Sequence, residues 1–541
     1  MRTVREETYT LLRALGLSTI FGNPGSTELA FLDNFPNDFR YILSLHEGAA
    51  VAMADGYAQA TRQPALVNVH TAPGLGNAMG NIVAAHANKT PLIITAGQQV
   101  RAMLLLEPWL CNRDAPDLPK PYVKWSYEPL RAQDVPAALA RAWYIAQQQP
   151  AGPVFISIPK DDWLAPAEPY VPRNVAHRTA PDPVALRDLV AALQASTSPA
   201  LVVGAGVDRS GAWSAGIALA ERLSAAVWAA PASERASFPE THPLFQGFLP
   251  LAQARIAETL APYDLVLVIG APIFRYYPYV PGPVVADGTT LVQITDDPDE
   301  AARAPAGTSI IGNIDLAIRQ LTELLSGNAS SARHHIDHDA DSVASRSPGR
   351  DSPMRPYAST PMSPAFVLHT LAQVLPPNAV IFEETPSNVV HLQSYIHITQ
   401  SSGYYSAASG GLGWAMPAAI GVQLAQPDRR AVCILGDGSS MYAIQVLWTA
   451  ARHALPIICV VLNNQQYAIL KAFAQFEGIS GALPGLDLPG IDVVAIAQGF
   501  GCEARRVVTP NMLVEAFAWA FQRTGPVVVD VQIEPAIPPL L

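Results

Sequence analysis

The sequence predicts an α/β protein of three domains, each a mainly parallel sheet covered by helices. Three observations lead to this prediction. The chain has 541 residues, which exceeds the size that one hydrophobic core organises. Half of the residues are hydrophobic and only 15% are charged, so there is apolar material for several cores. Short apolar runs alternate with helical patterns, which is typical of parallel sheets with helices on their faces.

The first predicted domain spans residues 1–180. Its apolar runs at 64–69, 91–95 and 154–158 are expected to be buried strands, and the segments 47–60 and 134–148 have helical patterns. The domain is expected to end near residue 180, where prolines cluster.

The second predicted domain spans residues 181–325, with expected strands at 200–203, 265–269 and 291–294. Gly204-Ala-Gly206 follows the first of these strands. A single GxG is a weak nucleotide-binding signal, because that motif needs a third glycine and a placed acid. We therefore favour a tight strand-to-helix turn.

Residues 326–362 have the composition of a linker, rich in Ser, Arg, Asp, His and Pro. His334, His335 and His338 could form a metal cluster, but a solvated linker is the favoured interpretation. The third predicted domain, 363–541, returns to strand–helix alternation, with expected strands at 431–435, 456–462 and 527–531. The third domain shares this alternation of strands and helices with the first domain, which suggests two related domains flanking a different one.

Charge and composition exclude several classes of protein. The formal net charge is −11 and there is no basic run, so binding to nucleic acid or to an anionic membrane is not expected. No apolar stretch reaches the ~20 residues of a membrane span, and the first residues lack a signal-peptide core. The four cysteines form no CxxC pair and are expected to be reduced and buried. These features predict a cytoplasmic protein.

The strongest motif lies in the third domain. The expected strand 431–435 runs into Gly436-Asp437-Gly438, and the next strand ends at Asn463-Asn464. The separation, 464 − 437 = 27 residues, accommodates one helix and one strand. We therefore expect both polar side chains at the carboxyl ends of adjacent parallel strands, which is the edge where open α/β sheets bind ligands.

These residue types fit a metal-bound diphosphate. Mg2+ prefers hard oxygen ligands and usually takes one or two carboxylates, with phosphates and water completing its shell. Asp437 can supply a carboxylate, Asn464 an amide oxygen and Gln466 a backbone carbonyl. Glycines let a phosphate approach closely, and a helix expected to start after Gly438 favours negative charge. The expected diphosphate-binding residues of this segment are Gly436, Asp437, Gly438 and Ser439. Two ordinary turns would be the alternative, which the paired motif disfavours.

This motif pair resembles the diphosphate anchor of thiamine diphosphate enzymes. More closely, the chain resembles benzoylformate decarboxylase and its relatives among the 2-oxo acid decarboxylases, over almost its whole length. The resemblance is densest at 21–26, 95–99, 123–129, 269–276 and 410–413. It implies a pyrimidine-binding domain (1–180), a central domain (181–325) and a diphosphate-binding domain (363–541), with thiamine diphosphate and Mg2+ as cofactors.

The resemblance also implies roles for residues of the first domain. Glu47 matches the glutamate that faces N1′ of the cofactor's aminopyrimidine and tunes its basicity. His70 follows the expected strand 64–69, and a histidine there can relay protons near neutral pH. The hydroxyl of Ser26 could bind the substrate carboxylate, or cap a helix.

In the third domain, Gly410 matches the residue whose carbonyl meets the cofactor's 4′-amino group. Leu412 matches the apolar residue that holds the cofactor bent. Ser387 is expected to be a further diphosphate contact.

The sequence departs from the family at the second active-site histidine. Tyr277 occupies the matching place, and a phenol with a pKa of ~10 is a poorer proton shuttle at pH 7 than imidazole. The substrate pocket also differs, since Ser406 replaces an aromatic ring and Ile469 a small residue. Phe473 is kept, and Trp109 and Leu110 lie in a loop expected to cover the neighbouring subunit's site.

The favoured function is non-oxidative decarboxylation of a benzoylformate-like 2-oxo acid to an aldehyde and CO2. A carboligase or lyase of the same cofactor class, acetolactate-synthase-like or benzaldehyde-lyase-like, is the alternative. A non-enzymatic, structural relic is disfavoured because Glu47, His70, Asp437 and Asn464 are all present. The resemblance implies a homotetramer, arranged as a dimer of dimers, with each site between two subunits.

Overall fold

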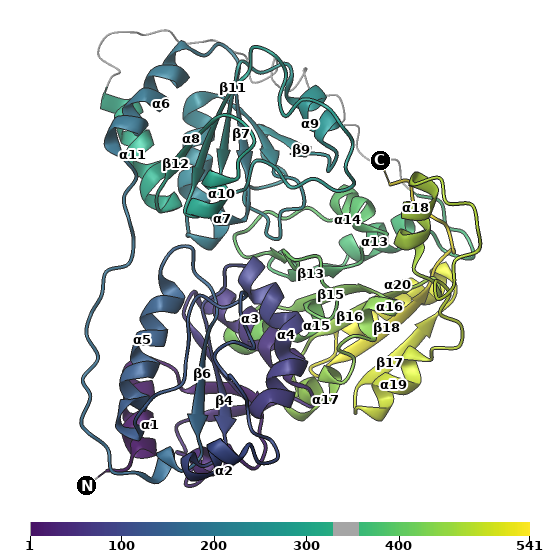
Figure 1. The fold of residues 1–541 in the computed structure, drawn as a ribbon. Coiled ribbons are helices and arrows are strands. Elements are labelled where there is room, and N and C mark those ends of the chain that lie inside the picture. The colour runs from purple at the N-terminus through teal and green to yellow at the C-terminus, as the bar shows by residue number, and fades with distance from the viewer. Residues whose placement is uncertain (1, 328–355, 541) are drawn as a thin grey trace. The chain divides into compact units, whose positions relative to one another are not determined.

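The computed structural model describes residues 2–327 and 356–540. Within these residues it has three six-stranded sheets flanked by helices, as predicted (Figure 1). Their strand orders are β2-β1-β3-β4-β6-β5, β12-β11-β10-β7-β8-β9 and β14-β13-β15-β16-β18-β17. The histidines of the predicted linker, His334, His335 and His338, lie outside the described residues.

The chain divides into two compact units. The first contains the residues up to 177, with 357–389 and 407–538, and so includes the first and third predicted domains. The second contains the described residues from 178 to 327 and also 390–406. The segment 390–406 therefore belongs to the central unit, although its sequence position is inside the third predicted domain.

The first sheet is built from strands whose side chains are mostly buried, as expected for a parallel sheet covered on both faces. Its strands are β1 (Thr19–Asn23), β2 (Arg40–Leu43), β3 (Ala65–Val69), β4 (Leu92–Gln98), β5 (Ser126–Tyr127) and β6 (Val154–Pro159). Its helices are α1 (Val4–Ala14), α2 (Leu29–Leu32), α3 (Glu47–Thr61), α4 (Thr71–Ala87) and α5 (Val135–Gln147), with 3-10 turns η1 (Arg101–Leu106), η2 (Ala132–Asp134) and η3 (Asp162–Leu164). The apolar sides of α1 and α5 share one core with β1, β4 and β6.

The third sheet carries the Gly-Asp-Gly motif. Its strands are β13 (Val380–Glu384), β14 (Tyr404–Tyr405), β15 (Ala431–Gly436), β16 (Ile458–Asn463), β17 (Glu503–Val507) and β18 (Val527–Gln532). Its helices are α13 (Pro364–Ala372), α15 (Ala415–Ala425), α16 (Asp437–Ser440), α17 (Val446–Arg452), α18 (Ala468–Phe476), α19 (Val493–Gly499) and α20 (Pro510–Phe521). Helix α14 (Val389–Tyr395) belongs, except for its first residue, to the central unit.

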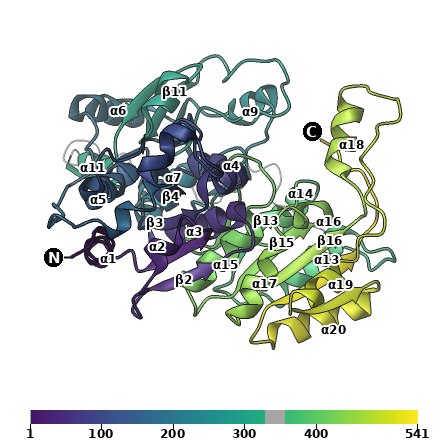
Figure 2. The same cartoon turned by 60° about the horizontal axis from the view of Figure 1, so that its bottom comes forward.

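Helices α3 and α15 join the two sheets of the first unit, and they lie side by side in Figure 2. Glycines allow their backbones to touch. A Cβ on Gly56 would lie 2.1 Å from the carbonyl oxygen of Ala418, and one on Gly421 would lie 1.9 Å from that of Met53. Because no side chain fits at either position, the crossing of the two helices is fixed by backbone contact.

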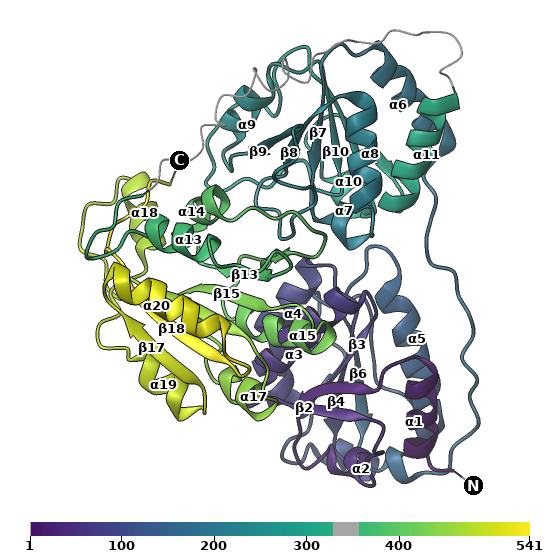
Figure 3. The same ribbon diagram turned by 180° about the vertical axis from the view of Figure 1, so that it is seen from behind.

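The central sheet has one core on each face, and Figure 3 shows helices on both sides of its strands. Its strands are β7 (Pro199–Val203), β8 (Ala226–Ala229), β9 (Phe245–Phe248), β10 (Leu265–Ile269), β11 (Thr290–Thr295) and β12 (Thr308–Ile311). Helices α6 (Pro183–Ala195), α8 (Trp213–Leu223) and α11 (Ile314–Gly327) cover one face and α9 (Gln253–Leu260) the other, with α7 (Ala205–Arg209) and α10 (Pro298–Ala302) at strand ends.

The Gly204-Ala-Gly206 turn follows β7 and is explained by packing. A Cβ on Gly206 would lie 2.7 Å from Cα of Gly270, and one on Gly204 would lie 2.4 Å from Cβ of Ala271. The glycines therefore let two loops approach each other, in agreement with the predicted tight turn.

No helix among the described residues is long and apolar enough to cross a membrane. Cys433, Cys459 and Cys502 are buried free thiols, as predicted, and Cys111 is half-buried.

Candidate active site

The Gly-Asp-Gly and Asn-Asn motifs meet at one edge of the third sheet. Strands β15 and β16 are parallel neighbours, with Gly436 in register with Leu462. Asp437 and Asn464 therefore follow the carboxyl ends of adjacent strands, as their spacing predicts. Helix α16 begins at Asp437 itself, slightly earlier than the sequence suggested.

Asp437 and Asn464 both present oxygens suited to a hard cation. Asp437 is buried, and its Oδ2 accepts the backbone N–H of Gln465 at 2.8 Å. Burial raises the pKa of this carboxyl to about 6. Oδ1 of Asn464 accepts the N–H of Gln466 at 3.2 Å, whereas Nδ2 of Asn463 donates to Asp530 at 2.9 Å. Of the two asparagines, Asn464 is therefore the candidate ligand, and this donor set fits Mg2+.

The residues on either side of Asp437, Gly436 and Gly438, carry no side chains of their own. A Cβ on Gly438 would lie 2.5 Å from the ring of Tyr467, so only glycine fits there. Gly410 has a φ of +68° and open space around its Cβ position, which suits close approach of a ligand. Ser387 is half-buried in the turn after β13, the strand next to β15, and so belongs to the same sheet edge.

The turn that carries Gly410 and Leu412 is anchored by a buried acid that the sequence did not reveal. Glu384, the last residue of β13, accepts the backbone N–H groups of Gly413, Trp414 and Ala415 at 2.7, 2.9 and 2.8 Å. These groups form the start of α15, where a carboxylate is favourable. Burial raises the pKa of Glu384 to about 7, against the opposing effect of the three N–H donors.

Glu47 is the first residue of α3 and is held by two amides. It is buried, Nδ2 of Asn23 donates to its Oε1 at 3.1 Å, and Nδ2 of Asn77 donates to its Oε2 at 3.1 Å. A Cβ on Gly74 would lie 3.2 Å from Oε1, so the glycine lets α4 approach the carboxylate. The carboxylate is thus fixed in orientation before any ligand arrives.

His70 lies just before α4 and is held by the loop that follows β1. Its Nδ1 lies 2.9 Å from Oε2 of Glu28 and 3.1 Å from Oγ1 of Thr27. Since a carboxylate only accepts, Nδ1 carries the proton and Nε2 is left for proton transfer. A Cβ on Gly25 would lie 2.2 Å from the ring, so glycine is required where the loop crosses the imidazole.

Ser26 is exposed in the same loop, between Gly25 and Thr27. The loop 23–28 therefore holds Glu47 through Asn23 and His70 through Thr27 and Glu28. Glu47 follows β2 and His70 follows β3, and these two strands flank β1, the strand that leads into the loop.

The predicted pocket residues are distributed over both units. Ile469 and Phe473 are four residues apart on α18, which places them on one face of that helix. Trp109 is 93% exposed and Leu110 42% exposed. Tyr277, 64% exposed, and Ser406 belong to the central unit, and their place in a pocket stays a prediction.

Four polar residues of the site were missed from the sequence. They are Asn23, Glu28, Asn77 and Glu384. Glu28 and Asn23 stand in the glycine-containing loop after β1, where an acid and an amide are a usable signal for a site. Asn77 and Glu384 carry no local signal, because their partners lie 30 and 29 residues away in sequence, respectively.

The fold and this donor set define a class of protein: an enzyme that holds a diphosphate cofactor at the edge of a parallel sheet. Comparison with known families agrees. Residues 2–113 match the N-terminal TPP binding domain of thiamine pyrophosphate enzymes, 186–321 their central domain and 387–531 their C-terminal TPP binding domain.

Individual relatives are more specific. Benzoylformate decarboxylase of Pseudomonas aeruginosa is 43% identical over 98% of this chain and 99% of its own. The crystal structure of benzoylformate decarboxylase from Polynucleobacter necessarius is 43% identical, with a TM-score of 0.93 over both whole chains. The 4-hydroxybenzoylformate decarboxylase of Rhodococcus jostii is 40% identical, with a TM-score of 0.90 over 98% of this chain and 99% of that one. The chain belongs to the thiamine pyrophosphate enzyme family, in the group that contains benzoylformate decarboxylase.

Proposed function

We propose that this protein is a thiamine diphosphate- and Mg2+-dependent decarboxylase that converts an aromatic 2-oxo acid of the benzoylformate type into an aldehyde and CO2. The observation that carries the proposal is the loop 23–28, which holds both Glu47 and His70. A buried, oriented carboxylate beside a histidine with one committed nitrogen is what cofactor activation and proton transfer require. The relatives that carry this activity match the whole chain.

The residues of the third sheet would hold the cofactor. Asp437, Asn464 and the carbonyl of Gln466 would bind Mg2+. The diphosphate would lie against Ser387, Gly436, Gly438 and Ser439. When bound, thiamine diphosphate supplies the electron sink that accepts the electrons of the broken carbon–carbon bond.

The remaining residues act on the cofactor ring and on the substrate. Glu47 would accept a hydrogen bond from the pyrimidine, and Leu412 and the Gly410 carbonyl would fix the ring's position. Ser26 would bind the substrate carboxylate. Nε2 of His70, once it has taken up a proton, would deliver the proton that replaces CO2, because Nδ1 is already bonded to Glu28.

We further propose that each site is completed by a second copy of the chain, in a homotetramer. The segment around η1 supports this, because it exposes large apolar side chains that a partner would cover. They are Met103, Leu105, Leu106, Trp109 and Leu110, exposed by 41, 93, 74, 93 and 42%. Sedimentation velocity at micromolar concentration should give a tetramer, and a fully active monomer at nanomolar concentration would exclude it. A cytoplasmic location remains part of this proposal.

Carboligation is a second candidate, and one observation favours it. Tyr277 stands where the family has a histidine, and its side chain is exposed. A weaker acid would leave more time for a second aldehyde to react in place of a proton.

One experiment tests the proposed function. The protein is supplied with thiamine diphosphate, Mg2+ and a panel of 2-oxo acids that includes benzoylformate, 4-hydroxybenzoylformate and pyruvate. We expect CO2 and the aldehyde, fastest from an aryl substrate, and loss of activity after chelation of the metal. Hydroxyketone as the main product would favour carboligation, and no CO2 from any 2-oxo acid would refute decarboxylation.

A further inference from the structure

The segment 398–406 is hydrogen-bonded along its length to residues 234–240 of the central unit. Glu240 donates its N–H to the carbonyl of Ile398 at 2.9 Å, and its carboxyl accepts the N–H of Ile398 at 2.9 Å. At the other end, Ser406 donates its N–H to the carbonyl of Glu234 at 2.9 Å. The backbone of Ser406 is therefore placed by the central unit, four residues before Gly410.

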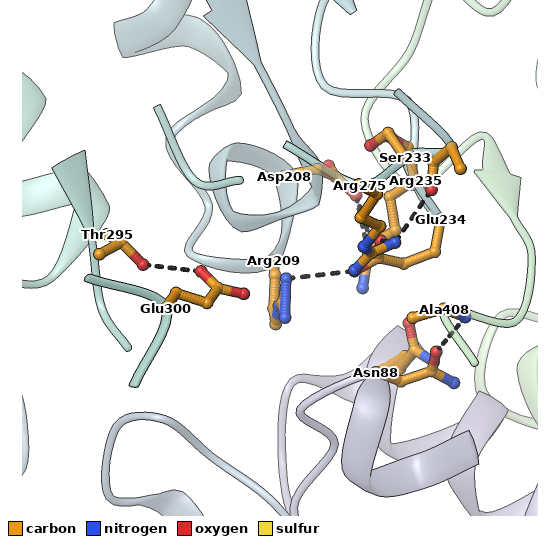
Figure 4. Close-up of polar contacts among 12 residues, drawn as sticks. Asn88, Asp208, Arg209, Ser233, Glu234, Arg235, Arg275, Thr295, Glu300 and Ala408 are labelled. Atoms are coloured by element: carbon orange, nitrogen blue, oxygen red, sulfur yellow. Dashed lines mark hydrogen bonds and ion pairs between the residues drawn. The ribbon is translucent and has the colours of Figure 1, made fainter. Parts of the chain in front are cut away.

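Two buried charges form the centre of this contact. Arg235 is 2% exposed and Asp208 is fully buried. Nε and Nη2 of Arg235 each lie 2.7 Å from Oδ2 of Asp208 (Figure 4). Burial alone would lower the pKa of Arg235, but Asp208 and its neighbours raise it, so the guanidinium stays charged.

The pair's other polar atoms are directed at the segment. Oδ1 of Asp208 accepts the hydroxyl of Ser401 at 2.5 Å and the N–H of Ser402 at 3.1 Å. Nη2 of Arg235 donates to the hydroxyls of Ser402 at 3.2 Å and Tyr405 at 3.3 Å. The guanidinium also lies 4.7 Å from the centre of the Tyr405 ring, within cation–π range.

The backbone that receives Ser406 is itself fixed by charge. Glu234 is buried, and lies 2.9 Å from Arg275 and 3.4 Å from Arg209 (Figure 4). Burial would raise the pKa of Glu234, but Arg275 and Arg209 outweigh it and lower the pKa. The ion pairs of the Glu234 side chain thus help to fix its backbone, whose carbonyl accepts the N–H of Ser406.

The segment combines buried side chains with a strained backbone conformation. A cavity lies beneath it, with Arg235, Glu240, Ile398 and Tyr404 among its lining residues. Ser402 has a φ of +55°, a backbone conformation that costs energy for a residue with a Cβ. The bonds to Asp208 and Arg235 compensate for this strain. A buried ion pair is a weak source of net stability, but it can fix one arrangement among several.

We propose that Asp208 and Arg235 are positioning residues that set substrate affinity through Ser406. The inference rests on the proposed function and on the sequence-based prediction that Ser406 lines the substrate pocket. The ion pair binds residues 401–405. These residues in turn fix the backbone position of Ser406, and so the position from which its side chain extends. Loosening the segment should therefore weaken binding of the 2-oxo acid, while the cofactor, held by residues of the other unit, binds as before.

The test removes hydroxyls and leaves the ion pair intact. Ser401→Ala with Ser402→Gly removes one hydroxyl contact from each charge, and glycine tolerates the positive φ at 402. The N–H of residue 402 and the hydroxyl of Tyr405 keep their bonds to the pair. We expect KM for benzoylformate to rise about tenfold, as for lost hydrogen bonds to charged groups, with kcat and thiamine diphosphate affinity within twofold. In a Ser406→Ala background the same change should add little, because contacting residues are not additive. The matched control is Ser196→Ala, which removes a hydroxyl bonded to Asp264 at the other end of the strands. This change should leave KM unchanged.

Hydrogen exchange gives a readout that does not need activity. Peptides covering 398–406 should exchange at least tenfold faster in the double variant and normally in Ser196→Ala. Unchanged KM despite faster exchange would overturn the inference. So would equal losses in kcat, KM and cofactor affinity, which would indicate a general structural role. If the unmodified protein decarboxylates no 2-oxo acid, the proposed function fails, and unchanged exchange at the Ser406 amide would separately overturn the positioning role.

Discussion

Glu28→Gln is the sharpest test of how the histidine is held. The carboxylate of Glu28 is buried and has four neighbours that can donate. Oε1 accepts the hydroxyl of Thr27 at 2.7 Å and the N–H of Gly97 at 2.9 Å. Oε2 accepts the N–H of Gly25 at 2.8 Å and faces Nδ1 of His70 at 2.9 Å.

A glutamine keeps the shape but replaces one acceptor with a donor. If its NH2 group faces Gly97, that backbone N–H loses its partner. If the NH2 faces Gly25, that N–H loses its partner and Nδ1 of His70 must become an acceptor, so the proton moves to Nε2. Either way one buried N–H is unsatisfied, which costs about 1–3 kcal/mol of folding stability. In either orientation His70 loses its carboxylate partner, so kcat should fall by about 10²-fold, the lower end for a general acid.

The assay is the rate of aldehyde formation with saturating thiamine diphosphate and Mg2+, alongside urea unfolding. Glu128→Gln serves as control, because Glu128 also accepts a buried hydroxyl, that of Ser157 at 2.6 Å, but does not contact His70. We expect KM for the cofactor to be unchanged in both variants. A normal kcat in Glu28→Gln with reduced stability would show that Glu28 only supports the loop. It would refute a role for the Glu28 carboxylate in proton transfer by His70.

Three further predictions concern other groups. Asp437→Ala should abolish Mg2+-dependent cofactor binding by calorimetry, whereas Glu47→Gln should bind normally and lose turnover; normal binding and activity in both would refute the site. Tyr277→His should raise the ratio of aldehyde to hydroxyketone when a 2-oxo acid and an aldehyde are supplied together, and an unchanged ratio from about pH 6 to 8, where histidine titrates, would place Tyr277 outside the proton path. Burial raises the pKa of Glu240 from 4.5 to about 8, so the folded protein keeps a proton that the unfolded chain loses within that range. Stability from this group therefore falls as pH rises from 4.5 to 8, and the gain in urea midpoint from Glu240→Gln should be larger at pH 8 than at pH 5; an equal gain at both would contradict the assignment.

The elements of the fold were predictable wherever the signal is local. The strands 64–69, 431–435 and 527–531 were found within two residues of their observed ends, because parallel strands buried on both faces are continuous apolar runs. The meeting of Asp437 and Asn464 was predictable for the same reason. Consecutive parallel strands become neighbours, here connected through α16 and α17, and their ends then share one edge.

Contacts distant in sequence were not predictable. Glu384 binds N–H groups 29 to 31 residues away, and Glu28 binds Gly97, 69 residues away. The segment 390–406 reads as part of the third domain, yet its serines bond to Asp208 and Arg235, more than 160 residues earlier. No period or spacing encodes such pairs, since each depends on how the separate elements pack.

The crossing of α3 and α15 distinguishes sequence positions that tolerate substitution from positions that do not. At Gly56 and Gly421 even a methyl group would collide with the opposite backbone, so mutational tolerance there is close to nil. Ser406, Ile469 and Phe473 are only half-buried and sit outside that crossing. Exchanging side chains at these three predicted pocket positions should therefore change the substrate range without altering the helix crossing. Libraries aimed at new 2-oxo acids belong at these predicted positions, with the two glycines left as they are.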